Sequence, residues 1–163
     1  MFLYHGSNVE IKEIDLNLSK PNKDFGRGFY LSNNYEQAYE MATFKTTFFR
    51  GTPLITKFEF DESLLKNGSL KVLSFPEYSK EWADFVFKNR NQENQDFSHD
   101  YDIVTGPIAN DRVGAQIRRF VEDDITFDTF LERLKYMKGI TFQYFFGTQK
   151  AIQTLVNKGL CHE

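Results

Sequence analysis

Short apolar segments that alternate irregularly with helical patterns constrain the fold of this chain more than any other feature. Six runs rich in aromatic and branched residues are expected to form strands: residues 1–5, 29–32, 54–60, 69–75, 101–108 and 140–146. Helical patterns fall between some of these runs and not others, in residues 79–90, 114–122 and 126–138 and in two segments with capping signals. This irregular mixture favours an α+β class over a regularly alternating βαβ sheet.

Two capping signals predict further helix starts. Asn33 lies three residues before Glu36, which is the spacing of a capping box, so a helix is expected to begin there. Thr148 is a candidate N-cap for a last helix that extends through the apolar residues as far as Val156.

The composition indicates one soluble domain over residues 1–163. Eighteen phenylalanines suggest a core built largely from aromatic packing. A net charge of −3 argues against a broad basic surface for nucleic acid, although it leaves room for a local phosphate or nucleotide pocket. The single cysteine excludes a disulfide within the chain, and His5, His99 and His162 lack metal-ligand spacing, so no metal is expected.

The chain lacks the sequence signals of export or membrane insertion. Its first residues carry no basic segment followed by a long apolar core, so they do not read as a signal peptide. No run reaches the roughly 20 apolar residues that a membrane span needs. We therefore expect a cytoplasmic protein that has no membrane partner.

Glycines flank an arginine immediately before the strand expected at residues 29–32. Glycine permits positive φ and close approach of the backbone to another group, and it weakens a strand interior. The Gly26-Arg27-Gly28 segment is therefore either a tight turn that leads into the strand or a loop shaped around a ligand.

Three polar or aromatic positions stand out on three different expected strands. His5 ends the first and precedes Gly6 and Ser7, Tyr30 lies in the second, and Gln143 interrupts the apolar run of the last. A histidine at a strand end and a tyrosine in a strand are most often structural. A glutamine on a core strand is less common, because its amide costs about 1–3 kcal/mol unless it finds hydrogen-bond partners.

The order of four short motifs resembles the ADP-ribosyltransferase fold. They read LYHGS at residues 3–7, DFGRGFYL at 24–31, YDIVTGPIANDR at 101–112 and QYFFGT at 143–148. The resemblance is to the branch with a His-Tyr-Glu triad, which includes the poly-ADP-ribose polymerases and diphtheria-type toxins, and to an uncharacterised bacterial family placed in that fold. It implies a split β-sheet core flanked by helices, with His5, Tyr30 and Gln143 as the catalytic residues.

The resemblance also implies where NAD, as co-substrate, would bind. His5 would bond the adenosine-side ribose, the backbone of Gly6 would hold the carboxamide of nicotinamide, and Ser7 would lie beside it. Tyr30 would stack on the nicotinamide ring, with Tyr39 as the candidate for a second aromatic neighbour.

The glycine-rich loop has a role in the same implied site. Gly28 and its neighbours would let the loop approach the dinucleotide closely. Arg27 would either meet the phosphates or lie in solvent.

Gln143 departs from the glutamate of that branch. A glutamine can bond the ribose hydroxyls but lacks the charge that stabilises an oxocarbenium-like centre. Another acid, with Asp111 as the nominee, would then supply the charge, or the domain would bind NAD without transferring anything. Asn110, Asp111 and Arg112 are candidates for an acceptor loop, with a structural turn as the alternative.

The resemblance implies an NAD-dependent mono-ADP-ribosyltransferase, an intracellular bacterial toxin or effector that would be paired with a small antitoxin protein. Its acceptor is open between protein, nucleic acid and small molecule. Three alternatives stay open: an NAD glycohydrolase, a non-catalytic NAD- or ADP-ribose-binding module, and a structural protein whose aromatic residues only pack.

Overall fold

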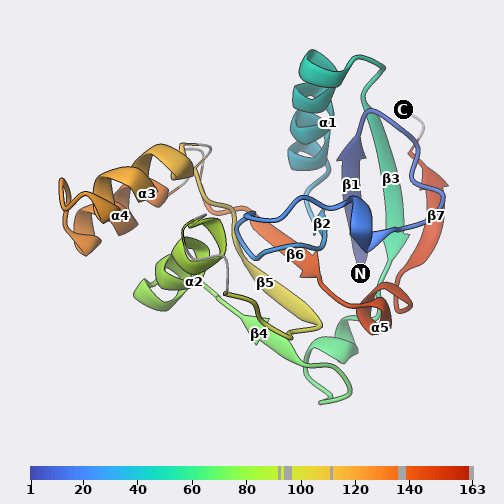
Figure 1. Ribbon diagram of the computed structural model, residues 1–163. Helices are drawn as coiled ribbons and strands as arrows, with labels where there is room; N and C mark the ends of the chain where they lie inside the picture. The colour runs from blue at the N-terminus through green and yellow to red at the C-terminus, as the bar shows by residue number, and fades with distance from the viewer. Residues whose placement is uncertain (92, 94–96, 111, 136–138, 162–163) are drawn as a thin grey trace.

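The computed structural model describes residues 1–91, 93, 97–110, 112–135 and 139–161. Within them, seven strands form one mixed sheet in the order β4-β5-β6-β2-β1-β3-β7 (Figure 1). They are β1 (Phe2–Ser7), β2 (Phe29–Ser32), β3 (Leu54–Glu59), β4 (Val72–Ser74), β5 (Ile103–Pro107), β6 (Phe142–Phe146) and β7 (Val156–Leu160). β4 and β5 are parallel, and the other neighbouring strands are antiparallel.

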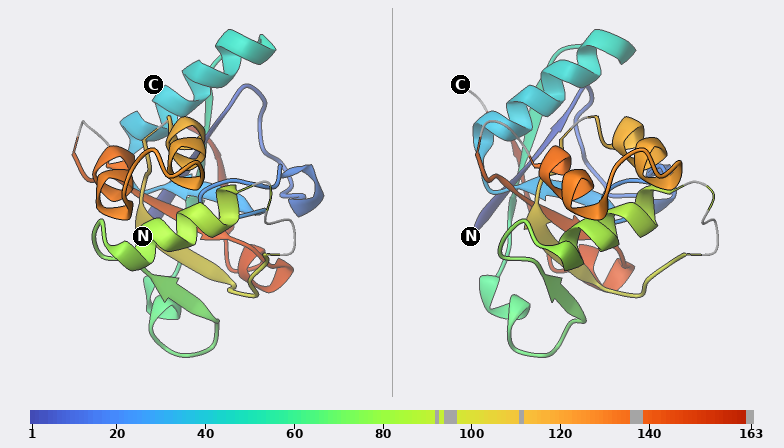
Figure 2. Two further views of the ribbon diagram at one scale, coloured as in Figure 1. Left: turned by 60° about the vertical axis from the view of Figure 1, so that its left-hand side comes forward. Right: turned by 90° about the vertical axis from the view of Figure 1, so that its left-hand side faces the viewer.

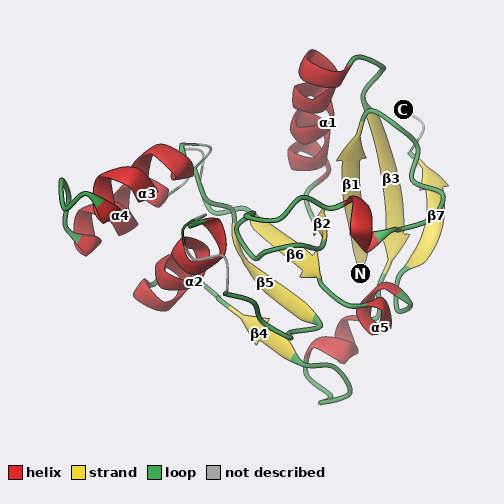
Figure 3. Ribbon diagram, in the orientation of Figure 1, coloured by secondary structure: helices red, strands yellow, loops and turns green. Residues whose placement is uncertain are grey.

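Helices flank this sheet and confirm the expected α+β class (Figure 3). They are α1 (Tyr35–Phe49), α2 (Lys80–Arg90), α3 (Val113–Val121), α4 (Phe127–Leu134) and the short α5 (Gln149–Ile152), with 3-10 turns at Leu16–Leu18 and Glu62–Leu65. α1 packs on β1 and β3, whereas α2, α3 and α4 gather beside the part of the sheet that contains β4 and β5 (Figure 2).

The pairing between neighbouring strands is shortest near the centre of the sheet, between β1 and β2. Among the described residues, a single opposed pair, Tyr4 and Ser32, defines the register of these two strands. β1 and β3, in contrast, are in register over six residues. Beyond Tyr4 and Ser32 the two halves of the sheet are therefore joined by side chains rather than by a continuing ladder.

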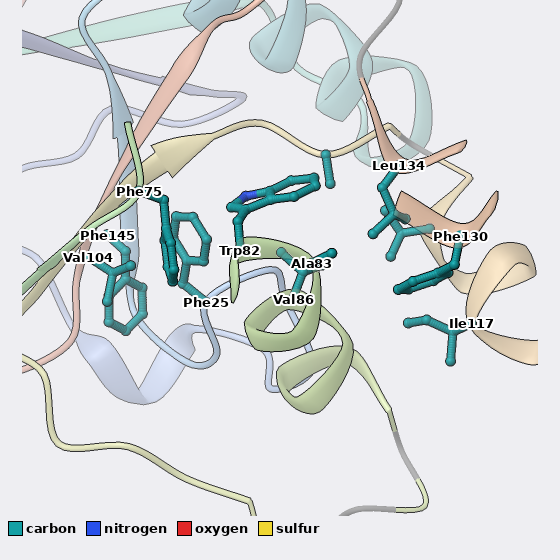
Figure 4. Close-up of a cluster of buried hydrophobic side chains, with 12 residues drawn as sticks. Phe25, Phe75, Trp82, Ala83, Val86, Val104, Ile117, Phe130, Leu134 and Phe145 are labelled. Carbon is teal, nitrogen blue, oxygen red and sulfur yellow. The ribbon is translucent and has the colours of Figure 1, made fainter. Parts of the chain in front are cut away.

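Alternating side chains give the sheet an apolar core on each face. On one face, Val104 and Phe145 pack with Phe25 and Trp82 against α2, α3 and α4 (Figure 4). The Trp82 indole N–H donates to the carbonyl of Pro107 at 3.1 Å, which satisfies its polar atom within this core.

The opposite face carries a second core, and α1 closes a third. The second contains Leu3, Phe58, Ile103 and Phe146 from four strands. The third is small: Ala38 and Ala42 bring α1 onto Ile55 of β3.

The end of the chain differs from the expected long helix. α5 stops at Ile152, and Val156, expected on that helix, instead starts β7 with its side chain exposed. β7 pairs with the edge of β3, and the Cys161 N–H donates to the carbonyl of Ile55 at 2.9 Å. An open sheet edge therefore overrides the helical pattern of the sequence.

The start of α1 also lies one residue later than expected. Asn34, rather than Asn33, is the N-cap, and its side chain accepts from the Gln37 N–H at 3.0 Å. Ser32 Oγ in turn accepts from the Asn34 N–H at 3.1 Å, which holds the turn between β2 and the helix. The other expected strands and helices are present with boundaries shifted by a few residues, and residues 136–138 of the expected 126–138 helix lie outside the described residues.

Candidate functional site

His5 lies where β1 and β2 separate. Its Nδ1 is 2.7 Å from the carbonyl oxygen of Tyr30, and its ring stacks on Phe29 with centroids 4.3 Å apart. Because a carbonyl only accepts, Nδ1 carries the proton and Nε2 is left as an acceptor. Nε2 faces the ammonium of Lys45 at 3.5 Å.

This environment keeps His5 neutral. Burial, followed by the charge of Lys45, lowers the pKa of His5 from 6.5 to about 3. The site therefore presents a neutral imidazole at physiological pH, with Nε2 as a hydrogen-bond acceptor.

Replacing His5 by asparagine is expected to change how stability depends on pH. The unfolded histidine binds a proton below about pH 6.5 and the folded one only near pH 3, so wild-type stability falls as pH drops through this window. The slope contributed by His5 approaches about 1.4 kcal/mol per pH unit. Urea unfolding at intervals between pH 7 and pH 4 should show a shallower fall for His5→Asn. Parallel curves would contradict a buried neutral His5.

Gly6 brings α1 into direct contact with β1. A Cβ on Gly6 would lie 1.8 Å from the carbonyl oxygen of Ala38 and 2.9 Å from the Ala42 nitrogen. The Gly6 carbonyl accepts a hydrogen bond of 2.7 Å from Lys45 Nζ. Burial, followed by the charge of Lys23, lowers the pKa of Lys45 from 10.5 to about 8.

Tyr30 is tied to the glycine-rich loop that precedes it. Its hydroxyl donates to the Gly26 carbonyl at 2.7 Å and accepts from the Phe25 N–H at 3.0 Å. Burial, followed by the charge of Asp24, raises the pKa of Tyr30 well above its usual value. Lys23 Nζ lies 5.1 Å from the ring centroid, so a ring that stacked on this face of Tyr30 would displace the Lys23 ammonium.

Gln143 is held in one orientation by two acceptors. In the sheet it lies opposite Ser32 on β2 and Gly106 on β5. Its Nε2 donates to Asp24 Oδ2 at 2.8 Å and to the Pro107 carbonyl at 3.4 Å. Since a carboxylate and a carbonyl only accept, Oε1 is the amide atom left for another partner.

Asp24 is a buried carboxylate behind Gln143, with 5% of its surface exposed. Its Oδ1 receives Arg90 Nε at 2.8 Å and Nη2 at 2.6 Å, and its Oδ2 also accepts from the Ala109 N–H at 3.4 Å. The glycine-rich loop, α2, β5 and β6 are thereby connected through one acid.

Sequence reasoning missed three groups of this site: Lys23, Asp24 and Lys45. Asp24 lies within the quoted DFGRGFYL motif, and an acid directly before a buried aromatic residue is a weak signal of a buried ion pair. Lys45 gave no signal, because its contact with His5 depends on how α1 crosses β1.

The remaining predicted residues have plain structural surroundings. Gly28 packs under the ring of Phe145, where a Cβ would come within 2.1 Å, and Arg27 is exposed. Ser7 is buried and accepts from the Val9 N–H at 3.4 Å, and Tyr39 is an exposed residue of α1.

Asn110 and Arg112 of the expected acceptor loop lie at the start of α3. Asn110 Oδ1 accepts from the N–H of Arg112 at 2.9 Å, and Arg112 is the N-cap residue of that helix. Asp111 lies outside the described residues.

The chain belongs to the family described as Protein of unknown function (DUF3990), whose model matches residues 1–156. The matched range includes β1, β2 and β6 and so every group described at the site. No curated protein matches the chain. In the described part of the chain, no helix is long and apolar enough to cross a membrane, and no group of three or more His, Cys, Asp or Glu side chains could hold a metal ion.

Proposed function

We propose that this chain is an NAD-dependent mono-ADP-ribosyltransferase with an ADP-ribosyltransferase-like fold. The observations that carry the proposal are the contact of His5 with the Tyr30 carbonyl where β1 and β2 separate, and the position of Gln143 on β6, the strand that pairs with β2. In the proposed biological role, the protein is an intracellular bacterial toxin or effector restrained by a small antitoxin protein.

The reaction breaks the nicotinamide–ribose bond of NAD and passes the ADP-ribose to an acceptor of unidentified class. The leaving group is neutral and the ribose carbon gains positive charge, so acceptors fixed around the ribose favour the transition state. Gln143 Oε1 is one such acceptor, and neutral His5 Nε2 is a second once the Lys45 ammonium moves away from it. The hydrogen bonds of His5 Nδ1 and Gln143 Nε2 orient the two side chains.

Asp24 compensates in part for the glutamate that Gln143 replaces. Its carboxylate lies directly behind the amide and polarises it, because Nε2 donates to a negative charge. Arg90 neutralises much of that charge, so the field at the ribose is weaker than that of a direct carboxylate. We therefore expect slow turnover.

The residues present fit the nicotinamide half of NAD. Tyr30 offers an aromatic ring whose one face is covered by the Lys23 ammonium, and a flexible lysine moves at low cost. Gln143 Oε1 is an acceptor for a ribose hydroxyl, and His5 Nε2 becomes one when Lys45 turns toward the ligand.

Chromatographic detection of nicotinamide released from NAD tests the proposal. Wild type is expected to release nicotinamide. The rate of release is expected to be lower by at least about 100-fold in His5→Ala and in Gln143→Ala, as for removal of a transition-state hydrogen bond. Gln149→Ala, which truncates an exposed glutamine of α5, is the control and should keep the wild-type rate.

Three other outcomes separate the alternatives. Nicotinamide release with all the ADP-ribose free in solution would indicate an NAD glycohydrolase. A melting temperature raised by NAD, without release in the presence of cell extract as a source of acceptor, would indicate a binding module, which the Gln143 amide favours. Equal release from wild type and both site variants would contradict the proposed site.

A further inference from the structure

Four cationic side chains lie close enough to act on one another around Lys23, although the chain as a whole is acidic. Lys20 and Lys23 come from the segment before β2, Lys45 from α1 and Arg90 from α2. Lys20 and Lys23 reach different rings, since Lys20 Nζ lies 5.6 Å from the centroid of Phe49 at the end of α1 and Lys23 Nζ lies over Tyr30.

These charges are close enough to influence each other. Burial, followed by the charges of Arg90 and Lys20, lowers the pKa of Lys23, with Asp24 opposing. Lys23 in turn contributes to the lowered pKa of Lys45. The segment before β2, α1 and α2 thus direct their positive charge to one region.

Asp24 does not balance this cluster, because Arg90 already occupies it. Among the ion pairs of the described residues, none involves Lys20, Lys23 or Lys45. Lys45 instead bonds two neutral groups, the Gly6 carbonyl and His5 Nε2. Two half-buried ammonium groups without a counterion are costly to the folded protein unless an anion joins them.

We propose that Lys23 and Lys45 bind the phosphates of a ligand that carries a diphosphate, at the separation of β1 and β2. Two ammonium groups beside His5 and Tyr30 match two linked phosphates with a ribose and an aromatic base on either side. The identification of that diphosphate with NAD rests on the proposed function. Diphosphate binding itself does not require transferase activity.

Proton uptake on binding is a second consequence. His5 on β1 and Lys23 on the loop before β2 are the titratable groups that face Lys45, and the Tyr30 ring lies under Lys23. A bound diphosphate raises the pKa of every group nearby, but His5 and Tyr30 stay neutral near pH 8, so only the two lysines change protonation. Binding at pH 8 should therefore take up protons, and affinity should fall as pH rises through about 8.

Isothermal titration calorimetry with inorganic pyrophosphate and with ADP-ribose tests the site. Both probes are expected to bind wild type, and Lys45→Met and Lys23→Met are each expected to weaken both by about tenfold or more, as for loss of a charge-assisted hydrogen bond. Lys66→Met, which removes an exposed lysine after the Glu62–Leu65 turn, is the matched control and should bind as wild type. Titrations of ADP-ribose at pH 8, in two buffers of different ionisation enthalpy, measure the proton uptake, because its phosphates carry no proton at that pH.

The results separate this inference from the transferase proposal. Pyrophosphate binding that depends on Lys23 and Lys45, without any nicotinamide release, supports the diphosphate site and rejects the transferase. Nicotinamide release that both methionine variants retain with an unchanged KM for NAD overturns the diphosphate site and leaves the transferase standing. Absence of pyrophosphate and ADP-ribose binding to wild type also overturns it. If Lys45→Met does not fold, Lys23→Met alone decides, because Lys23 contacts a ring face rather than a strand.

Discussion

Gly6→Ala is expected to lower the free energy of unfolding by about 3 kcal/mol or more, at or beyond the upper end of what overpacking costs. The new methyl group would lie 1.8 Å from the Ala38 carbonyl oxygen and 2.8 Å from its carbon. Both atoms belong to the backbone of α1, so no side chain can rotate away, and the helix must move off β1. Urea unfolding at neutral pH measures the loss.

Gly114→Ala is the control for this prediction. Gly114 lies in α3, and a Cβ at this position would meet nothing within 4 Å. Alanine is favoured over glycine in a helix by about 0.5–1 kcal/mol, so this variant should be as stable as wild type or slightly more stable. A Gly6→Ala protein with wild-type stability would contradict the close approach of α1 and β1.

Gln143→Glu is expected to destabilise the protein at neutral pH, although it introduces the acid that the proposed transferase reaction would favour at this position. The new carboxylate would replace an amide whose Nε2 lies 2.8 Å from Asp24 Oδ2. One of the two carboxylates can take up a proton, which removes the repulsion between them. At pH 7 this protonation costs about 3.7 kcal/mol for a carboxyl group with an ordinary pKa near 4.3, so the repulsion cannot exceed that value. We expect a loss of about 2–4 kcal/mol.

The loss should depend on pH in a defined direction. A carboxyl group whose pKa is raised in the folded state contributes most below its unfolded pKa, and that contribution disappears as pH rises through the folded value. The gap between Gln143→Glu and wild type should therefore be small near pH 4 and widen toward pH 7. Urea unfolding at both pH values measures it, and a gap that does not change would contradict the direct contact of the two side chains.

The double variant Asp24→Asn/Gln143→Glu exchanges the amide and the carboxylate between positions 24 and 143, so that one side chain again donates and the other accepts. The introduced amide can donate to the introduced carboxylate, which remains near Arg90. At pH 7 the double variant should be more stable than the sum of the two single losses predicts, by about 1–3 kcal/mol. If the proposed function holds, it should also release nicotinamide faster than wild type, because a carboxylate then faces the ribose directly.

Local patterns in the sequence predicted much of the fold and part of the site. Strand and helix periodicities depend on neighbouring residues, so the α+β class, the helix over 79–90 and the apolar residues of α4 could be derived from them. His5 stood out at the end of an expected strand, Tyr30 in the strand after the glycine-rich segment, and Gln143 as an interruption of an apolar run. The missed strand β7 shows the limit, since residues 156–160 become a strand only through pairing with β3.

What the sequence by itself determined about this protein is most of its helices and strands, and it suggested three residues for the candidate site. Only the tertiary structure decided which charges surround them. Asp24 and Gln143 are 119 positions apart and His5 and Lys45 are 40 apart, so the contacts between them depend on strand order and on the crossing of α1 over Gly6. Electrostatic interactions depend on distance and burial, neither of which is encoded in local periodicity.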